Sequence, residues 1–80
     1  MEEVVIVAAA RTAIGTFMGS LSTVAANILG AKVIEHLLGK TGVEPARIDE
    51  VILGQVLTAG TGQNPARTAA LNAALPVEVP

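Results

Sequence analysis

The amino-acid sequence predicts part of a layered α/β fold. Two short segments, residues 4–10 and 51–57, are apolar without alternation and rich in β-branched side chains. That pattern is typical of parallel strands that are covered on both faces. Between them, residues 24–38 have the periodicity of an amphipathic helix. Strand, helix and strand in this order predict a right-handed βαβ unit.

The composition is more typical of a segment of a larger α/β protein than of a self-sufficient domain. The chain has 80 residues, about half of one typical domain. Apolar residues make up 51% of it, but Phe17 is the only aromatic residue and fourteen residues are alanine. Large aromatic side chains usually dominate core energetics, so we expect only a small core.

Several functional classes are excluded by what the chain contains. Without cysteine it has no disulfide, thiolate metal site or cysteine nucleophile, and one histidine cannot build a zinc site alone. The net charge of −2 is spread out, unlike the basic footprint of a nucleic-acid binder. Its longest apolar run, residues 4–10, is too short to span a membrane, and Glu2 and Glu3 stand where a signal peptide would be basic. We expect a cytoplasmic protein that binds neither nucleic acid nor membrane.

The first predicted helix has clear boundary signals. Ser22 or Thr23 is placed to cap its first turn, and Gly39 or Gly42 to end it. Before the helix, residues 11–23 show no period and are expected to form a loop that leaves the carboxyl end of the first strand.

A second helix is predicted after the second strand. Gly54 inside that strand indicates a bulge or a close approach of another backbone. Asn64 and Pro65 suit the N-cap and the first helical position, and Pro76 stops a helix over residues 66–75. Small residues that permit close packing recur along it, namely Ala66, Ala69, Ala70, Ala73 and Ala74.

The loop before this helix partly matches a nucleotide-binding motif. Gly60 and Gly62 fit G-x-G-x-x-G, but Pro65 replaces the third glycine and the loop follows the second strand instead of the first. We therefore favour a tight turn over nucleotide binding.

The titratable side chains form no catalytic set. His36 lies on the polar arc of the first helix, where we expect a solvated side chain instead of a general base. Lys32 and Glu35, three residues apart, are expected to pair weakly. Adjacent residues point apart, so Asp49 and Glu50 do not form a glycosidase-like carboxylate pair.

Two arginines lie at positions where their side chains need a hydrogen-bond acceptor or an opposite charge. Arg11 closes a predicted buried strand, and Arg67 lies in the first helical turn, where a cation opposes the macrodipole. We favour structural bonds to loop carbonyls or a carboxylate over contact with an anion or substrate. Gln63 and Asn64 offer amides at the same loop and are suited to bonds across an interface.

Two stretches resemble the thiolase family. Residues 4–15, VVIVAAARTAIG, are similar to the opening of thiolases, and residues 50–67, including GQNPAR, to their second strand and second helix. The resemblance covers all 80 residues and points to the biosynthetic acetyl-CoA acetyltransferase type. It implies that residues 1–80 are the leading β-α-β-α part of an incomplete thiolase N-terminal domain.

The resemblance also implies an activity for the parent protein. Thiolases join two acetyl-CoA molecules into acetoacetyl-CoA and CoA, reversibly, through a cysteine thiolate that takes an acetyl group. Coenzyme A thioesters are then substrates, with no covalently bound cofactor, and the parent is expected to be a homo-oligomer, a dimer or tetramer. The loop around residues 63–67 is expected to lie towards the dimer interface as a structural element.

The cysteines, catalytic histidines and CoA-binding loops of thiolases lie beyond Pro80. No catalytic, cofactor-binding or metal-binding residue is therefore carried over, and the 80-residue chain alone is expected to be inactive. Met18 departs from the family pattern where glycine is common, and Ile28 where an acidic residue is common. The alternative is a truncated, non-catalytic structural or interaction fragment.

Overall fold

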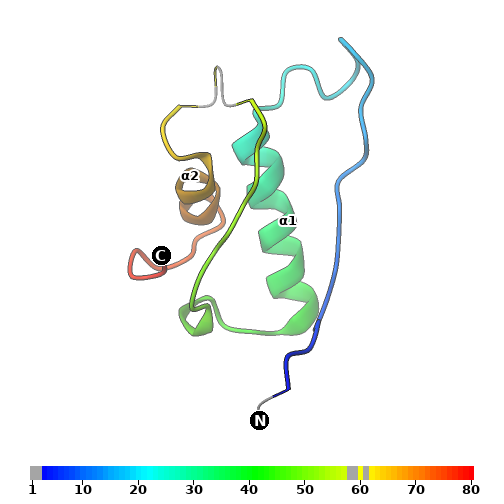
Figure 1. Ribbon diagram of the computed structural model, residues 1–80. Coiled ribbons are helices and arrows are strands. Elements are labelled where there is room, and N and C mark those ends of the chain that lie inside the picture. Colours follow the sequence, from blue (N-terminus) through cyan, green and yellow to red (C-terminus); the bar gives the residue numbers. More distant parts are fainter. Residues whose placement is uncertain (1–2, 58–59, 61) are drawn as a thin grey trace.

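The computed structural model describes residues 3–57, 60 and 62–80. Over these residues the elements are α1 (Ala26–Thr41), the 3-10 helix η1 (Pro45–Arg47) and α2 (Pro65–Asn72). Figure 1 shows α2 beside α1, with long non-helical segments before α1 and between η1 and α2. In the part of the chain that is described, no helix has the length and hydropathy needed to cross a membrane.

Helix α1 begins later than the sequence predicts, and the predicted side-chain cap is wrong. Its N-cap is Ala25, which makes no side-chain hydrogen bond. Ser22 lies instead within a series of backbone turns, where its N–H donates to the Gly19 carbonyl at 3.0 Å and the Val24 N–H donates to Leu21 at 3.1 Å. Because these turns extend to Val24, neither Ser22 nor Thr23 stands at the N-cap position.

The end of α1 confirms one of the two predicted glycines. Gly42 has a left-handed backbone, with φ 72°, and its N–H donates to the Leu38 carbonyl at 2.9 Å. Glycine adopts this conformation without steric cost. Gly39 lies inside the helix and does not end it.

Helix α2 begins as the sequence predicts. Pro65 is its first residue, and the Asn64 side chain accepts a hydrogen bond from the Arg67 backbone N–H at 3.1 Å. The backbone of Asn64 is left-handed, with φ 46°, which asparagine tolerates better than most residues.

The same helix ends at Asn72, three residues before the predicted end. Ala74 is left-handed, with φ 65°, its N–H donates to Leu71, and the Leu75 N–H donates to Ala70. These two bonds form a Schellman motif, in which the left-handed position is usually glycine. The chain therefore turns out of the helix before Pro76 is reached.

The left-handed backbone of Ala74 has a steric cost for alanine that glycine does not bear. Ala74→Gly is therefore expected to stabilise the fold by about 1 kcal/mol. Asn72→Gly is the matched control, because Asn72 is exposed and helical and should lose stability on the same change. The apparent melting temperature of a longer protein that carries this segment measures both effects. Equal losses for the two variants would contradict the expectation.

Met18 also has a left-handed backbone, with φ 57°. Methionine adopts this region at a steric cost that glycine does not bear. The departure from the thiolase pattern at Met18 therefore falls on a residue whose backbone favours glycine.

The close contact between α1 and α2 depends on small residues. A Cβ added at Gly30 would lie 3.4 Å from the Ala69 Cβ and 3.6 Å from the Leu53 Cδ1. Ala69 is fully buried against this glycine. The small-residue packing predicted for α2 is thus confirmed where it faces Gly30.

The core is small and consists mostly of alanine. Among the described residues, the buried apolar side chains are Ala31, Ala69, Ala70, Ala73, Leu75 and Val79. The sequence predicts an apolar arc on α1 made of Ala26, Leu29, Gly30, Val33, Ile34, Leu37 and Leu38. All of these residues are half-buried except Ala26, which is exposed. The expectation of a small core is confirmed.

The two predicted strands are not formed as strands in this structure. Residues 4–10 and 51–57 have no strand assignment, and no backbone hydrogen bond between described residues joins them. They are not buried either, since Val4 is 97% exposed and Val56 is 97% exposed. A strand needs a neighbour for its backbone groups, and a parallel sheet needs cover on both faces. The described residues contain two such segments, and α1 and α2 are the longest helices among them that could cover a sheet.

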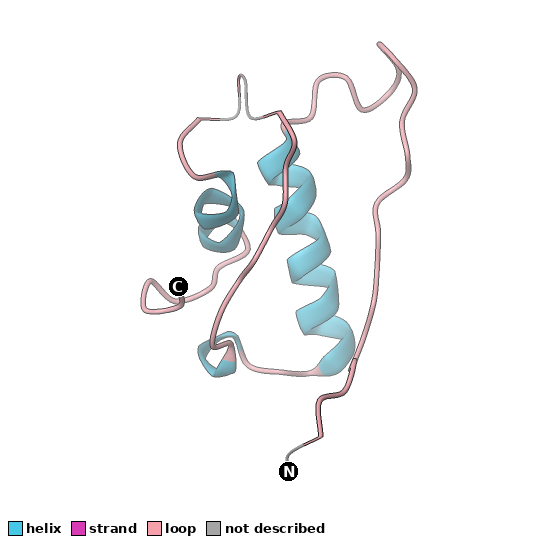
Figure 2. Ribbon diagram, in the orientation of Figure 1, coloured by secondary structure: helices cyan, strands magenta, loops and turns pink. Residues whose placement is uncertain are grey.

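The first segment nevertheless lies alongside α1. Residues 6–8 line a groove with Leu37 and Leu38 near the end of α1, while residues 10–12 line one with Lys32 and His36. The first segment therefore runs antiparallel to the helix, as a strand that precedes a crossover helix does. Figure 2 shows it as loop throughout.

Candidate functional site

A polar-edged groove lies where α1, the second apolar segment (residues 51–57) and α2 meet. Its volume is about 340 Å³. The lining residues are Ala26, Asn27, Gly30, Leu53, Gly54, Gln55, Asn64, Pro65 and Ala66. They come from the first two turns of α1, the middle of residues 51–57 and the start of α2.

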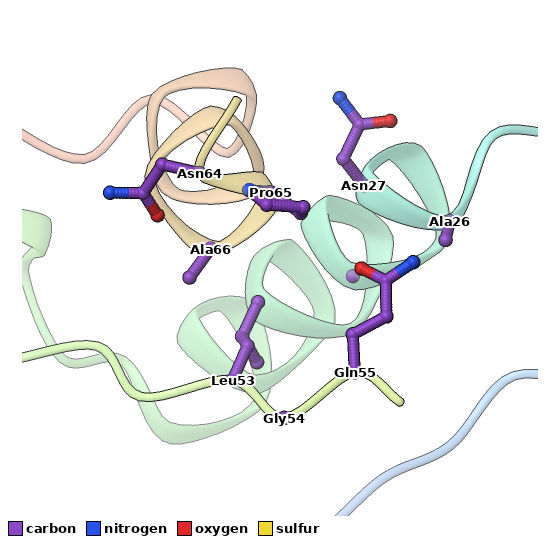
Figure 3. Close-up of a pocket in the computed structure, with 9 residues that line it drawn as sticks. Ala26, Asn27, Leu53, Gly54, Gln55, Asn64, Pro65 and Ala66 are labelled. Atoms are coloured by element: carbon purple, nitrogen blue, oxygen red, sulfur yellow. The ribbon is translucent and has the colours of Figure 1, made fainter. Parts of the chain in front are cut away.

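Figure 3 shows how the side chains of this groove are arranged. Leu53 and Gln55 both extend from the second segment towards the helices, while Gly54 lies between them. Residues two apart share a face in an extended chain, so the segment keeps the side-chain alternation of a strand. A Cβ added at Gly54 would meet nothing within 4 Å, so the predicted close approach of another backbone is absent among the described residues.

The groove offers amides and apolar groups, and its lining includes no nucleophile and no side chain suited to proton transfer. Its polar side chains are those of Asn27, Gln55 and Asn64. Of these, the Asn64 Oδ1 already accepts the Arg67 N–H at the N-cap. None of the lining residues carries a nucleophile or a group that titrates near neutral pH. The groove can hold a hydrogen-bonding group in place, and it cannot move a proton.

Arg67 is held by backbone carbonyls, one of the two kinds of structural partner that the sequence predicts. Its Nη2 donates to the Val77 carbonyl at 2.7 Å, and its Nη1 donates to the Val79 carbonyl. The partners lie on the chain that follows α2, within the same polypeptide. We call Arg67 with the carbonyls of Val77 and Val79 the Arg67 clamp.

The Arg67 clamp is connected to the second apolar segment. The Val51 N–H donates to the Pro80 carbonyl at 2.9 Å, and Val79 is buried beside it. A small cavity of about 100 Å³ between these elements is lined by Val51, Asn64, Ala66, Arg67, Ala70, Val79 and Pro80. Helix α2, the chain after it and the start of residues 51–57 are therefore linked.

The other candidate residues take the structural roles that the sequence favours. Lys32 Nζ lies 3.7 Å from Glu35 Oε2 on the exposed face of α1. His36 is exposed, as are Asp49 and Glu50. Arg11 is exposed and donates to the Thr12 carbonyl at 3.1 Å, which is a local bond to a loop carbonyl.

The loop before α2 supports the tight-turn interpretation. Gly60 and Gly62 have φ of 76° and 78°, in the left-handed region. Residues 58, 59 and 61 of this loop lie outside the described residues. Gln63 is exposed. Over the ranges that are described, no group of three or more acidic or histidine side chains is placed to hold a metal ion.

Sequence reasoning missed the amide-edged groove. Asn27, Gln55 and Asn64 belong to three separate segments, and nothing in the spacing of an asparagine or glutamine predicts that they meet. One usable signal was the glycine in the second turn of α1, because Gly30 lets α2 and Leu53 come close enough to form the groove wall.

A family model and several known proteins match this chain. The model described as "Thiolase, N-terminal domain" matches residues 4–80. An acetyl-CoA acetyltransferase of Pseudomonas aeruginosa is 64% identical over 80 residues, and one of Cupriavidus necator is 60% identical over 80 residues. Each match covers 100% of this chain and 20% of the relative. The chain thus spans about a fifth of the length of the curated relatives that it matches.

A solved structure follows the same path. The crystal structure of the Bacillus anthracis acetyl-CoA acetyltransferase superposes with a TM-score of 0.87 at 45% sequence identity. The match covers 94% of this chain and 19% of that chain. It extends well beyond the two helices, so most of the non-helical chain also follows the course seen in that enzyme.

Proposed function

Because the chain belongs to the thiolase family, we propose that it is the N-terminal segment of an acetyl-CoA C-acetyltransferase. The observation that carries the proposal is the 64% identity to the Pseudomonas aeruginosa enzyme over all 80 residues. The parent enzyme would join two acetyl-CoA molecules into acetoacetyl-CoA and CoA, reversibly. CoA thioesters would be its substrates.

In this proposal the chain is scaffold. A cysteine thiolate beyond residue 80 takes an acetyl group from acetyl-CoA and releases CoA. A second acetyl-CoA, deprotonated at its methyl carbon, attacks the acyl-enzyme, and the new carbon–carbon bond forms as the thiolate leaves. Oxyanion holes stabilise the oxygens that become negative. The nucleophilic cysteine of this scheme does not belong to residues 1–80, because these residues include no cysteine.

We further propose that residues 4–10 and 51–57 become parallel strands when the rest of the sheet is present. Their apolar side chains, exposed here, then face helices on both sides. Residues 1–80 would form the β-α-β-α part of an incomplete N-terminal domain. A homo-oligomer, dimer or tetramer, and a cytoplasmic location complete the proposal; sedimentation of the whole enzyme and cell fractionation check them.

A chimera tests the proposed function. Residues 1–80 replace the matching N-terminal fifth of the Pseudomonas aeruginosa enzyme, and thiolytic cleavage of acetoacetyl-CoA is measured. We expect activity within about tenfold of the unmodified relative, because the scaffold differs at about a third of its positions and supplies no reacting group. The same enzyme without its N-terminal fifth is the control.

A soluble, correctly assembled chimera without activity would contradict the scaffold assignment. The alternative is a non-catalytic structural or interaction fragment, which the exposed apolar side chains of residues 4–7 favour. If the chimera fails to assemble while the isolated chain forms a stable, defined complex, that alternative gains support.

A further inference from the structure

The Arg67 clamp fixes the backbone just before residue 80. Two guanidinium nitrogens of one side chain reach two carbonyls, those of Val77 and Val79. The planar fork of arginine suits such a pair of acceptors, whereas the single ammonium of lysine does not match it. The chain here belongs to no helix, so side-chain bonds contribute much of its order.

The position of Arg67 in α2 is otherwise unfavourable. It lies in the first turn, where a positive charge opposes the helix macrodipole. The N-cap is already made by Asn64, which accepts the backbone N–H of Arg67 and needs no particular side chain there. The two carbonyl bonds are therefore what explains an arginine at this position.

Beyond the clamp, Pro80 accepts a hydrogen bond from the Val51 N–H at 2.9 Å. The clamp thus sets the end of residues 77–80 against the start of residues 51–57. In the relatives the match covers about 20% of the length, and the groove in this segment holds no reacting group. In the proposed parent enzyme, the reacting groups would be placed by polypeptide that continues from this point.

We propose that Arg67 is a positioning residue, which sets the path of the polypeptide beyond residue 80 relative to residues 51–57. This inference rests on the proposed function. A shift of the chain by about 1 Å misaligns groups that react further on, and such a misplacement costs on the order of a hundredfold in rate.

The chimera of the preceding test serves for the experiment, with Arg67→Lys and Arg67→Ala. The matched controls are Arg47→Lys and Arg47→Ala, because Arg47 is an exposed arginine in η1. We expect kcat of Arg67→Lys to fall roughly 10- to 100-fold with KM nearly unchanged. Guanidinium ion at a low, non-denaturing concentration should restore part of the kcat of Arg67→Ala. The Arg47 variants should keep full activity.

A second measurement does not depend on activity. Hydrogen exchange at the Val51 amide should become about tenfold faster in Arg67→Lys, because the bond to Pro80 then opens more often. The proposal is overturned if Arg67→Lys keeps its kcat, or if the lost kcat merely follows a lost folded fraction without rescue by guanidinium. If the unsubstituted chimera is itself inactive, the proposed function fails, and exchange at Val51 alone then decides whether the clamp holds this path.

Discussion

The purified 80-residue chain is expected to self-associate and to show no cleavage of acetoacetyl-CoA. Large apolar side chains that a sheet would cover are open to water, with Val4 97%, Ile6 90% and Val56 97% exposed. Unpaired strand-forming segments of this kind template association with other chains. The chain also contains no cysteine to act as a nucleophile.

Charged substitutions on these segments should reduce the association. The double variant Ile6→Lys with Val56→Lys places two like charges where apolar side chains are exposed, and we expect a shift towards monomer in sedimentation velocity. Asn72→Lys adds charge to an exposed polar position of α2 and should leave the association largely unchanged. A monodisperse monomer of the unsubstituted chain would show that the segments are already covered.

The inactivity has its own measurement. Cleavage of acetoacetyl-CoA by CoA is assayed on the isolated chain against a blank without protein. Turnover above the blank, at a level that scales with the concentration of the chain, would mean that a reacting group within residues 1–80 has been overlooked.

The second large effect is expected at Gly30, where a leucine should destabilise the fold by about 1 to 3 kcal/mol. A Cβ there already meets the Ala69 Cβ at 3.4 Å, so the longer side chain has to push α2 away. Leucine is the better helix former, which offsets part of that cost. The apparent melting temperature of the chimera, where both helices are held in a complete fold, provides the measurement.

Gly39→Leu is the matched control, since Gly39 lies in the same helix with nothing within 4 Å of an added Cβ. It should stabilise slightly, by up to about 0.8 kcal/mol, through helix propensity alone. Gly30→Ala should lie between the two, because 3.4 Å is an ordinary contact distance for a methyl group. A Gly30→Leu variant as stable as Gly39→Leu would contradict the packing of α2 on α1.

Local chemistry explains the features that were predicted correctly. Asn64 and Pro65 start α2 because an amide oxygen can accept a free N–H of the first turn and proline lacks one. Gly42 ends α1 because its backbone can become left-handed without steric cost. Even the carbonyl partners of Arg67 follow from a charge in a poor position, which needs acceptors.

The two predictions of helix ends that failed, at the start of α1 and the end of α2, depend on competition between alternative local hydrogen-bonding patterns. Ser22 is a good cap by type, but the turns of residues 16–24 place it before the N-cap position. Helix α2 ends at Asn72 because a Schellman motif forms around Ala74, although alanine gives no sequence signal for one. Propensity does not decide between such alternatives, since they differ by about 1 kcal/mol.

The sequence by itself determined the helices, their glycine and asparagine termini, the absence of a nucleophile and, through its motifs, the family. Only the tertiary structure decided which residues meet: Gly30 against Ala69, the amides of the groove, and Arg67 on Val77 and Val79. Residues 4–10 and 51–57 show how a preference in the sequence differs from what the tertiary structure forms. A helix satisfies its backbone hydrogen bonds within one segment, whereas a strand depends on neighbouring segments. The sequence of residues 4–10 and 51–57 therefore favours strands, but no pairing among the described residues forms them.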